Sequence, residues 1–283
     1  MQYQKQVERY LSDWRDLFSA LKEKPCSRRT GQPDNLDRLE RLILDNPPLY
    51  RTPDGQWRQR RKGLIRDRIL PAPRVRAFRE GFPTVPRDQW DKLIADRDAV
   101  DLALYSGYRM DQDGVGSCAA ESANNGVEVC EIWAGQKPTK FNPWFGYHTT
   151  SGGVDRGSSL QDNLRFIQEY GCCPEEVWPR SKGWRTRPSA EAYDAAKAHR
   201  LLEFWEVTNW DEFASALLYG MPVYFGYPGH AILAVKLLAK DRLLYENSWG
   251  ADWGDNGFGS LSYNRIAWEY GAYAFRLATD AVE

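Results

Sequence analysis

The sequence predicts an α+β fold in which helices come first along the chain and strands follow. Up to about residue 200, apolar residues recur at helical spacing, as in Leu160, Leu164 and Ile167, which share one face of a helix. Beyond residue 209, short apolar runs are separated by Gly, Pro, Lys-Asp and Asp-Asn-Gly turns, a pattern typical of strands. Helices and strands that are segregated along the chain indicate the α+β class.

Composition excludes several classes of function. The chain has 283 residues and a formal net charge of -1, so no overall field attracts nucleic acid or a membrane. The N-terminus has no apolar core of a signal peptide, and no apolar run is long enough to span a bilayer; we therefore expect a cytoplasmic protein. The 5 cysteines form no Cys-x-x-Cys pair, which predicts reduced thiols. We expect neither a metal nor another cofactor.

Residues 1–81 differ from the rest and are expected to form a mainly helical, basic extension. Apolar spacing predicts helices over 7–21 and 36–43. Basic residues then crowd the range 58–68, without a recognition motif or stacking aromatics for nucleic acid, so nucleic acid is an unlikely partner. A proline-rich connector follows, and we place the domain boundary between residues 81 and 82.

The main domain, 82–283, is expected to contain a helix that begins at Cys118, a second over 160–170 that Gly171 ends, and an Ala-rich third over 189–200. Asn209 with Glu212 can cap a short helix that runs to Leu218. The predicted strands are 223–225, 231–235, 243–245 and 258–263.

A glycine-rich turn, Gln112-Asp-Gly-Val-Gly-Ser-Cys118, delivers a cysteine to the first turn of a helix. There the positive end of the helix macrodipole favours a thiolate, the nucleophile of cysteine chemistry. Cysteine is also a common small core residue, so this placement alone does not establish catalysis. A catalytic Cys118 requires a base elsewhere in the chain.

His230 is the best candidate base among the 3 histidines. It opens a predicted strand, and Asn247 follows it within Tyr-Glu-Asn-Ser-Trp-Gly250. A thiolate needs an imidazole as its partner, and that imidazole needs a polar group to fix its ring. His148 and His199 lack such a partner at a matching position, and we interpret them as structural.

The order of Gln112, Cys118, His230 and the Asn247–Gly250 run resembles the papain-like cysteine peptidases, over roughly residues 85 to 278. The resemblance implies a helical half that carries the cysteine, a β-barrel half that carries the histidine, and a substrate cleft between them. It also implies a role for each site residue. In the catalytic set, Gln112 forms the oxyanion hole, Cys118 is the nucleophile, His230 is the base and Asn247 orients His230. The substrate-binding set is Gly116, Ser117, Gly157, Ser158 and Trp249.

The glycine pair that binds the substrate backbone in this family falls on Gly157-Ser158 rather than on Gly152-Gly153, counting back from the end of the second helix. Two residues depart from the family pattern. Val115 stands where a stapling cysteine is usual, in agreement with a reducing compartment, and Ala119 replaces an aromatic residue. The Asp155-Arg-Gly-Ser-Ser and Trp178-Pro stretches look more like bacterial and phage members.

The sequence therefore predicts a cysteine endopeptidase acting on a polypeptide, with no membrane partner. Two alternatives stay open: an amidase acting on peptidoglycan or isopeptide bonds, and an inactive structural component of a larger assembly, such as a virion. Residues 1–81 are either a removable prosegment or a retained module that docks on an assembly partner. Retention is favoured, because the family's propeptide pattern is missing and the basic stretch suits an acidic partner better than a substrate cleft.

Overall fold

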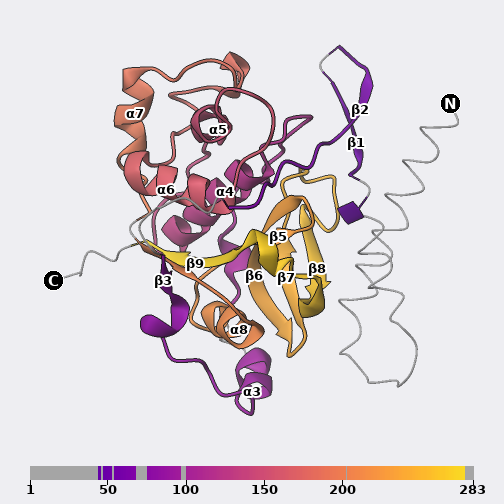
Figure 1. Ribbon diagram of the computed structural model, residues 1–283, viewed down its shortest axis with the longest axis vertical. Helices are drawn as coiled ribbons and strands as arrows, with labels where there is room; N and C mark the ends of the chain where they lie inside the picture. Colours follow the sequence, from indigo (N-terminus) through magenta and orange to yellow (C-terminus); the bar gives the residue numbers. More distant parts are fainter. Residues whose placement is uncertain are drawn as a thin grey trace, which may run out of the picture.

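The computed structural model of the chain describes residues 44–45, 47–52, 54–67, 75–96, 100–201 and 203–277. The helices expected over 7–21 and 36–43 lie outside the described residues. Helices gather above a large sheet whose other face is covered by further helices (Figure 1). The predicted α+β class is confirmed.

The helices follow the sequence signals closely. The second predicted helix has the expected bounds and ends at Gly171, whose φ of 93° favours glycine. The short helix after Asn209 is capped as expected, since the Asn209 side chain accepts a hydrogen bond from the Glu212 N–H at 3.0 Å. No helix of the described part is long and apolar enough to cross a membrane. The α-helices are α3 (Trp90–Ala95), α4 (Cys118–Trp133), α5 (Trp144–Thr150), α6 (Leu160–Tyr170), α7 (Ala190–Ala196) and α8 (Trp210–Leu218). Short 3-10 helices are η1 (Phe78–Glu80), η2 (Leu102–Tyr105), η3 (Arg180–Lys182), η4 (Tyr263–Arg265) and η5 (Trp268–Tyr270).

The strands form a two-stranded hairpin and a seven-stranded sheet of order β3-β4-β9-β5-β6-β7-β8. All neighbours in the large sheet are antiparallel except β3 and β4. In the described structure β3 and β8 form the two edges of this sheet, which makes up the strand-rich half that the resemblance to papain-like peptidases implies. The strands are β1 (Leu49–Arg51), β2 (Trp57–Gln59), β3 (Arg76–Ala77), β4 (Glu203–Glu206), β5 (Val223–Tyr227), β6 (His230–Ala239), β7 (Arg242–Glu246), β8 (Phe258–Ser262) and β9 (Ala272–Arg276).

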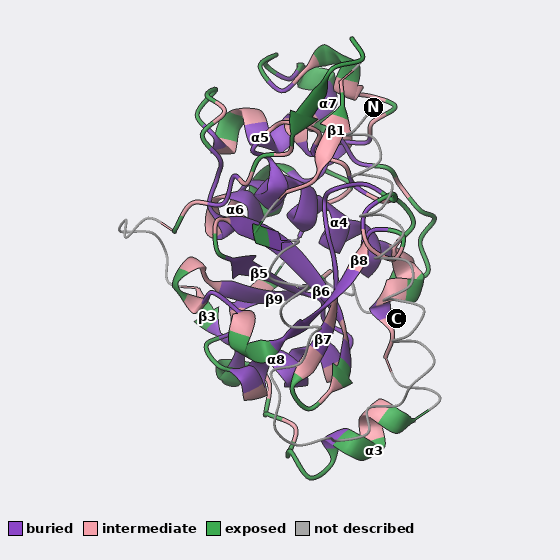
Figure 2. Cartoon of the chain, turned by 90° about the vertical axis from the view of Figure 1, so that its right-hand side faces the viewer, coloured by how far each residue is buried: buried purple, intermediate pink, exposed green. Residues whose placement is uncertain are grey.

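Both faces of the central strands are buried, as the continuous apolar runs of β5 and β6 require (Figure 2). Along β6, Ala231 and Leu233 pack with the core under α4, whereas Ile232 and Ala234 pack with the core under α8. This alternation is the period of two of a β-strand. The strand that carries His230 is thereby fixed between two helical layers.

The four strands predicted from the sequence are confirmed as β5 to β8. β4 and β9 were not predicted, and they lie side by side in the sheet. β3 also joins this sheet, and Phe78 beside it is fully buried in the core. Residues 76–78 therefore pack with the domain that the sequence analysis began at residue 82.

Helix α4 lies against the sheet at a glycine. A Cβ atom built on Gly126 would lie 2.2 Å from the Phe275 ring of β9 and 3.1 Å from the Leu233 side chain of β6. Only a residue without a side chain permits this approach, and the approach sets the height of the Cys118 helix above the sheet. Gly126 thus links packing to the position of the candidate nucleophile.

We expect Gly126→Ala to lower the free energy of unfolding by about 1 to 3 kcal/mol, because overpacking against Phe275 outweighs the gain in helix propensity of about 1 kcal/mol. Chemical denaturation followed by circular dichroism measures the change. In the double variant Gly126→Ala, Phe275→Leu, the smaller partner should recover part of the loss. Equal losses with and without Phe275→Leu would contradict this account of the contact.

Candidate active site

Cys118 is the first residue of α4, directly after Gly116 and Ser117, and it is fully buried. Its sulfur receives hydrogen bonds from backbone groups of Ala231 in β6 and of Gly63. The sulfur therefore lies between the helical half and the sheet half, where the resemblance to papain-like peptidases placed it.

His230 opens β6 and is held by two residues that follow β7. Its Nε2 lies 2.7 Å from the Asn247 Oδ1, and its ring stacks on Trp249 with centroids 4.7 Å apart and planes at 25°. The Asn247 Oδ1 also accepts the Ser248 N–H at 2.8 Å, so Nε2 carries the hydrogen that is donated to it. The buried Nδ1 has no hydrogen-bond partner in the described structure and is the nitrogen left to accept a proton.

Gln112 is oriented by the segment that carries Asn247. Its Oε1 accepts the Ser248 hydroxyl at 2.8 Å, and its backbone N–H donates to the Ser248 carbonyl at 2.9 Å. The side-chain amide donates to the carbonyls of Val115 and Arg61, both at 2.8 Å. Gln112 and Asn247 are thus linked through Ser248, which forms hydrogen bonds with both side chains.

Residues 60–67, here named the covering segment, follow the β1–β2 hairpin and run between Ser158, which precedes α6, and Gly229, in the turn between β5 and β6 (Figure 1). The Gly63 carbonyl accepts the Ser158 N–H at 2.9 Å, and the Ile65 N–H donates to the Ser158 carbonyl at 3.3 Å. On the other side, the Leu64 N–H donates to the carbonyl of Gly229, next to His230, at 3.1 Å. The covering segment therefore bridges the two halves directly above Cys118.

This placement corrects one expectation. The basic stretch 58–68 was expected to suit an acidic partner better than the region of the catalytic residues, and for residues 60–67 that expectation is wrong. Ser158 pairs with the extended backbone of residues 63–65 of the protein itself, and its role toward a substrate stays a prediction. The Gly152-Gly153 pair forms no such contact in the described structure.

Three glycines make the approach of the covering segment close. A Cβ atom on Gly63 would lie 1.8 Å from the Gly116 carbonyl oxygen, and a Cβ atom on Gly157 would lie 1.9 Å from the Gly63 carbonyl oxygen. Any side chain at Gly63 therefore collides with backbone, which cannot yield as a flexible side chain can. Gly63 and Gly157 therefore fit only as glycines, and Gly116 leaves little room for a side chain.

Ion pairs anchor the covering segment along its length. The Arg60 guanidinium pairs with both oxygens of the Asp111 carboxylate. Further along are ion pairs of Arg61 with Asp155 at 2.9 Å and of Lys62 with Asp45 at 3.7 Å. At the far end, the Asp67 carboxylate accepts the Gln161 N–H in the first turn of α6 at 3.0 Å and the Tyr273 hydroxyl at 2.6 Å.

The covering segment also changes the protonation of the candidate pair. Burial raises the pKa of the Cys118 thiol to about 11. Burial, with a smaller contribution from the positive charge of Lys62, lowers the pKa of the His230 imidazole to about 3, although the Asn247 hydrogen bond acts to raise it. Both shifts favour the neutral thiol and neutral imidazole, because a charged form has lost its water. In this closed state, desolvation therefore opposes the thiolate that the start of the helix favours.

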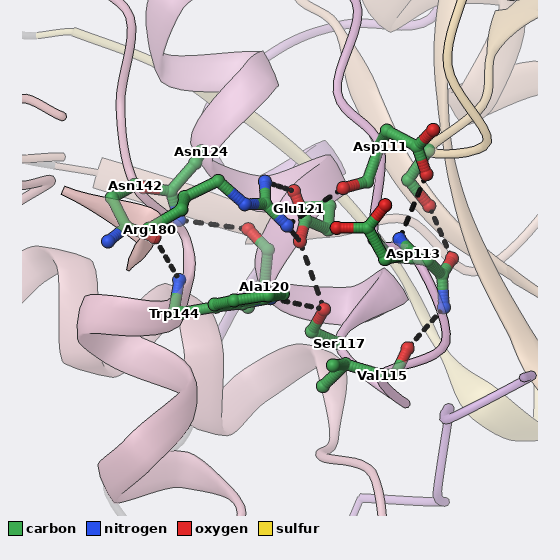
Figure 3. A network of polar contacts seen from close by, with 12 residues as sticks. Asp111, Asp113, Val115, Ser117, Ala120, Glu121, Asn124, Asn142, Trp144 and Arg180 are labelled. Carbon is green, nitrogen blue, oxygen red and sulfur yellow. Dashed lines mark hydrogen bonds and ion pairs between the residues drawn. The ribbon is translucent and has the colours of Figure 1, made fainter. Parts of the chain in front are cut away.

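A buried polar network centred on Arg180 and Glu121 holds both ends of the loop from 111 to 117 (Figure 3). Arg180 forms an ion pair with Glu121 at 2.9 Å, donates to the Asp111 carbonyl at 2.8 Å and stacks over the Trp144 ring at 4.3 Å. The Ser117 hydroxyl donates to Glu121 at 2.9 Å. Ser117, predicted to bind substrate, thus turns its side chain into this network instead of toward the covering segment.

The two other histidines have structural contacts. The His199 Nδ1 lies 2.8 Å from the Glu131 carboxylate, and the His148 Nδ1 lies 3.2 Å from the Trp184 carbonyl. The described cysteines 118, 130, 172 and 173 form no disulfide. Among the described residues, no group of three His, Cys, Asp or Glu could hold a metal ion.

Sequence reasoning missed several residues of this region: Gly63, Glu121, Tyr147, Asp155 and Arg180. A glutamate in the first turn of α4 is an ordinary helix signal, so nothing in the sequence showed that Glu121 would be buried against Arg180, far along the chain. Gly63 lies within a run of basic residues that looks solvated. Only the tertiary structure brings these residues to the site.

With this geometry established, the chain has the papain-like cysteine peptidase fold. Its structure is similar to that of xylellain, a cysteine protease from Xylella fastidiosa, with a TM-score of 0.61, 20% identity and coverage of 78% of this chain and 98% of that one. It is similar to digestive procathepsin L 3 of Tenebrio molitor (TM-score 0.53, 17% identity, 72% and 76% covered) and to the Carica candamarcensis cysteine protease CMS1MS2, solved in complex with E-64 (0.52, 16%, 63% and 97%).

In sequence, the chain is 25% identical over 202 residues to an uncharacterised peptidase C1-like protein of Acanthamoeba polyphaga mimivirus. The match spans 56% of this chain and 65% of the viral protein. No protein-family profile matches the chain.

We expect Arg180→Met to lower the free energy of unfolding by about 3 to 5 kcal/mol, because it leaves the Glu121 carboxylate buried without its counter-charge. The side chains of Glu121 and Arg180 are 0% and 16% exposed, so solvent cannot replace the lost partner. Urea denaturation measures the change. The matched control is Arg185→Met, which removes an exposed arginine stacked on Trp184 and should cost no more than about 1 kcal/mol. A similar small loss for Arg180→Met would contradict this role.

The raised pKa of Cys118 predicts the pH dependence of its alkylation. With a pKa of about 11, roughly one molecule in a thousand carries the thiolate at pH 8, and this fraction rises about tenfold per pH unit. The rate of reaction of Cys118 with iodoacetamide, followed by mass spectrometry of its peptide, should therefore rise from pH 7 to 10 without levelling. A rate that levels between about pH 9 and 10 in the unmodified chain would show an ordinary thiol, whose pKa is about 8.5, and refute the shift.

Proposed function

We propose that the protein is a cysteine endopeptidase in which Cys118 is the nucleophile and His230 the base. The observation that carries the proposal is the His230 ring: Nε2–H is committed to Asn247, Trp249 covers one face, and Nδ1 is left without a partner. That geometry serves a base that takes a proton and returns it. The papain-like fold and the viral peptidase C1-like relative support the assignment.

The chemistry that these residues support is acyl transfer. The Cys118 sulfur attacks a peptide carbonyl while its proton passes to the His230 Nδ1, and the imidazolium then protonates the leaving amine. The Gln112 amide, which donates to the Arg61 carbonyl, is placed to donate instead to the oxyanion of the substrate. Water then hydrolyses the thioester, with His230 again acting as the base.

The described state is closed to a substrate. Residues 61–65 occupy the hydrogen-bonding groups of Gln112, Ser158 and Gly229, and Cys118 is fully buried. Gly63 of the covering segment meets the sulfur with its backbone, and the Arg61 carbonyl engages the Gln112 amide. Activity therefore requires that this segment move or be cut, which makes a prosegment role the better reading of residues 60–67. Retention of the whole range 1–81 as a docking module, which the sequence analysis favoured, stays a prediction.

Two alternatives follow from the same fold. An amidase for peptidoglycan or isopeptide bonds would use the same residues on another acyl donor, and the likeness to bacterial xylellain and a viral protein keeps a bacterial or phage role open. A structural component of an assembly would need no ordered base. The hydrogen bonds of His230 and Gln112 favour an enzyme over that component.

We expect Gly63→Val in the full chain to expose the site and to switch on hydrolysis of a fluorogenic peptide, because the valine side chain collides with the Gly116 carbonyl. The matched control Arg58→Val changes an exposed residue of β2 and should leave the chain inactive. Circular dichroism confirms that both variants are folded.

In the Gly63→Val background, Cys118→Ala should abolish hydrolysis and labelling by an epoxide thiol probe, and Gln112→Ala should lower turnover by about 10² to 10³. Casein and peptidoglycan sacculi, tested as parallel substrates, distinguish the peptidase from the amidase. Labelling that persists after Cys118→Ala, or hydrolysis that survives it, would refute the proposed nucleophile.

A further inference from the structure

We propose that Asp155 makes this enzyme selective for a basic residue at the position whose carbonyl Cys118 attacks. The substrate class is therefore a polypeptide with arginine or lysine at the acyl side of the cleaved bond. This inference rests on the proposed function and deepens it. It is carried by the way in which the protein's own Arg61 is held.

The Asp155 carboxylate is held in a fixed position by hydrogen bonds. Its Oδ1 accepts the Gly116 N–H and the Tyr147 hydroxyl, both at 2.8 Å. Gly116 lies two residues before Cys118, so these hydrogen bonds fix the carboxylate beside the candidate nucleophile. The Asp155 side chain is only 14% exposed, and its second oxygen, Oδ2, is the one that faces the covering segment.

Arg61 contacts the site at both of its ends. Its carbonyl accepts the Gln112 side-chain amide at 2.8 Å, and its guanidinium binds the Asp155 Oδ2 at 2.9 Å. In the proposed mechanism the carbonyl that engages Gln112 is the one under attack. In the closed state the residue whose carbonyl engages Gln112 is thus an arginine that places its side chain on Asp155.

Opening the site leaves Asp155 without a cation. The neighbouring Arg180 is committed to Glu121, and the Arg156 guanidinium donates to the Ser151 carbonyl. Once Arg61 departs, a charged carboxylate beside Gly116 lacks a partner at its free oxygen. A charge-assisted hydrogen bond from an arginine or lysine of the substrate restores that pair, whereas an acidic side chain would be repelled.

The test uses the full chain with Gly63→Val and peptide coumarins that differ only at the residue before the coumarin: arginine, lysine, citrulline or glutamate. Citrulline has the shape of arginine without its charge. We expect kcat/KM for arginine to exceed that for citrulline by about 10- to 100-fold, and Asp155→Asn to reduce this ratio to near one. Asn keeps the acceptor for Gly116 and Tyr147, so the charge alone is removed.

Asp45→Asn is the matched control, since Asp45 pairs with Lys62 of the covering segment away from Gln112. It should leave the arginine-to-citrulline ratio unchanged. If Asp155→Asn does not fold, Asp155→Ser removes the same charge. A ratio near one before substitution, or a high ratio that survives loss of the Asp155 charge, would overturn the inference.

A binding measurement separates this inference from the proposed function. In the variant Gly63→Val, Cys118→Ala, fluorescence anisotropy compares peptides with arginine or citrulline at the same position. Tighter binding of the arginine peptide that disappears with Asp155→Asn supports the role of Asp155 even if no substrate is hydrolysed. Equal binding of both peptides overturns it even if Cys118 proves to be the nucleophile.

Discussion

The structure depends on one contact between backbones, the approach of Gly63 to the Gly116 carbonyl two residues before Cys118. No side chain fits there, since a Cβ atom on Gly63 would lie 1.8 Å from that oxygen. The covering segment therefore reaches the hydrogen-bonding groups of Ser158 and Gly229, which belong to the two halves of the protein. Closing the site and joining the halves are consequences of the same contact.

This contact also decides the chemistry of the resting state. The start of α4 would favour a thiolate, but the helix macrodipole contributes only about 0.3 to 2 kcal/mol. Loss of water around Cys118 and His230 acts in the opposite direction and is larger: the pKa of Cys118 rises to about 11 and that of His230 falls to about 3. A neutral pair is therefore the stable form under the covering segment. The segment suppresses both access to the sulfur and its reactivity.

Much of the fold could be predicted from local signals. The bounds of α6, the Asn209 cap and strands β5 to β8 follow from periodicity and turn residues, which act within a few positions of the chain. Strands β4 and β9 could not be predicted, because they are short and their pairing is long-range. The site residues Gln112, Cys118, His230 and Asn247 were found through a motif and a resemblance. The covering segment was misread, since its charges pair with Asp111 and Asp155, whose positions the sequence does not reveal.

The ion pair of Arg61 with Asp155 bears both on the stability of the closed state and on the choice of ligand. Arg61 is 62% exposed, so its ion pair with Asp155 is partly screened and contributes little to the stability of the closed state. The closed state therefore rests more on the buried glycine contact, on the backbone hydrogen bonds of Gly63 and Leu64, and on the Arg60–Asp111 pair, in which Arg60 is only 9% exposed. A charged group that contributes little to holding the segment can still distinguish one ligand from another, because selectivity is a difference between affinities. Closure and recognition thus depend on different contacts of one short stretch of chain.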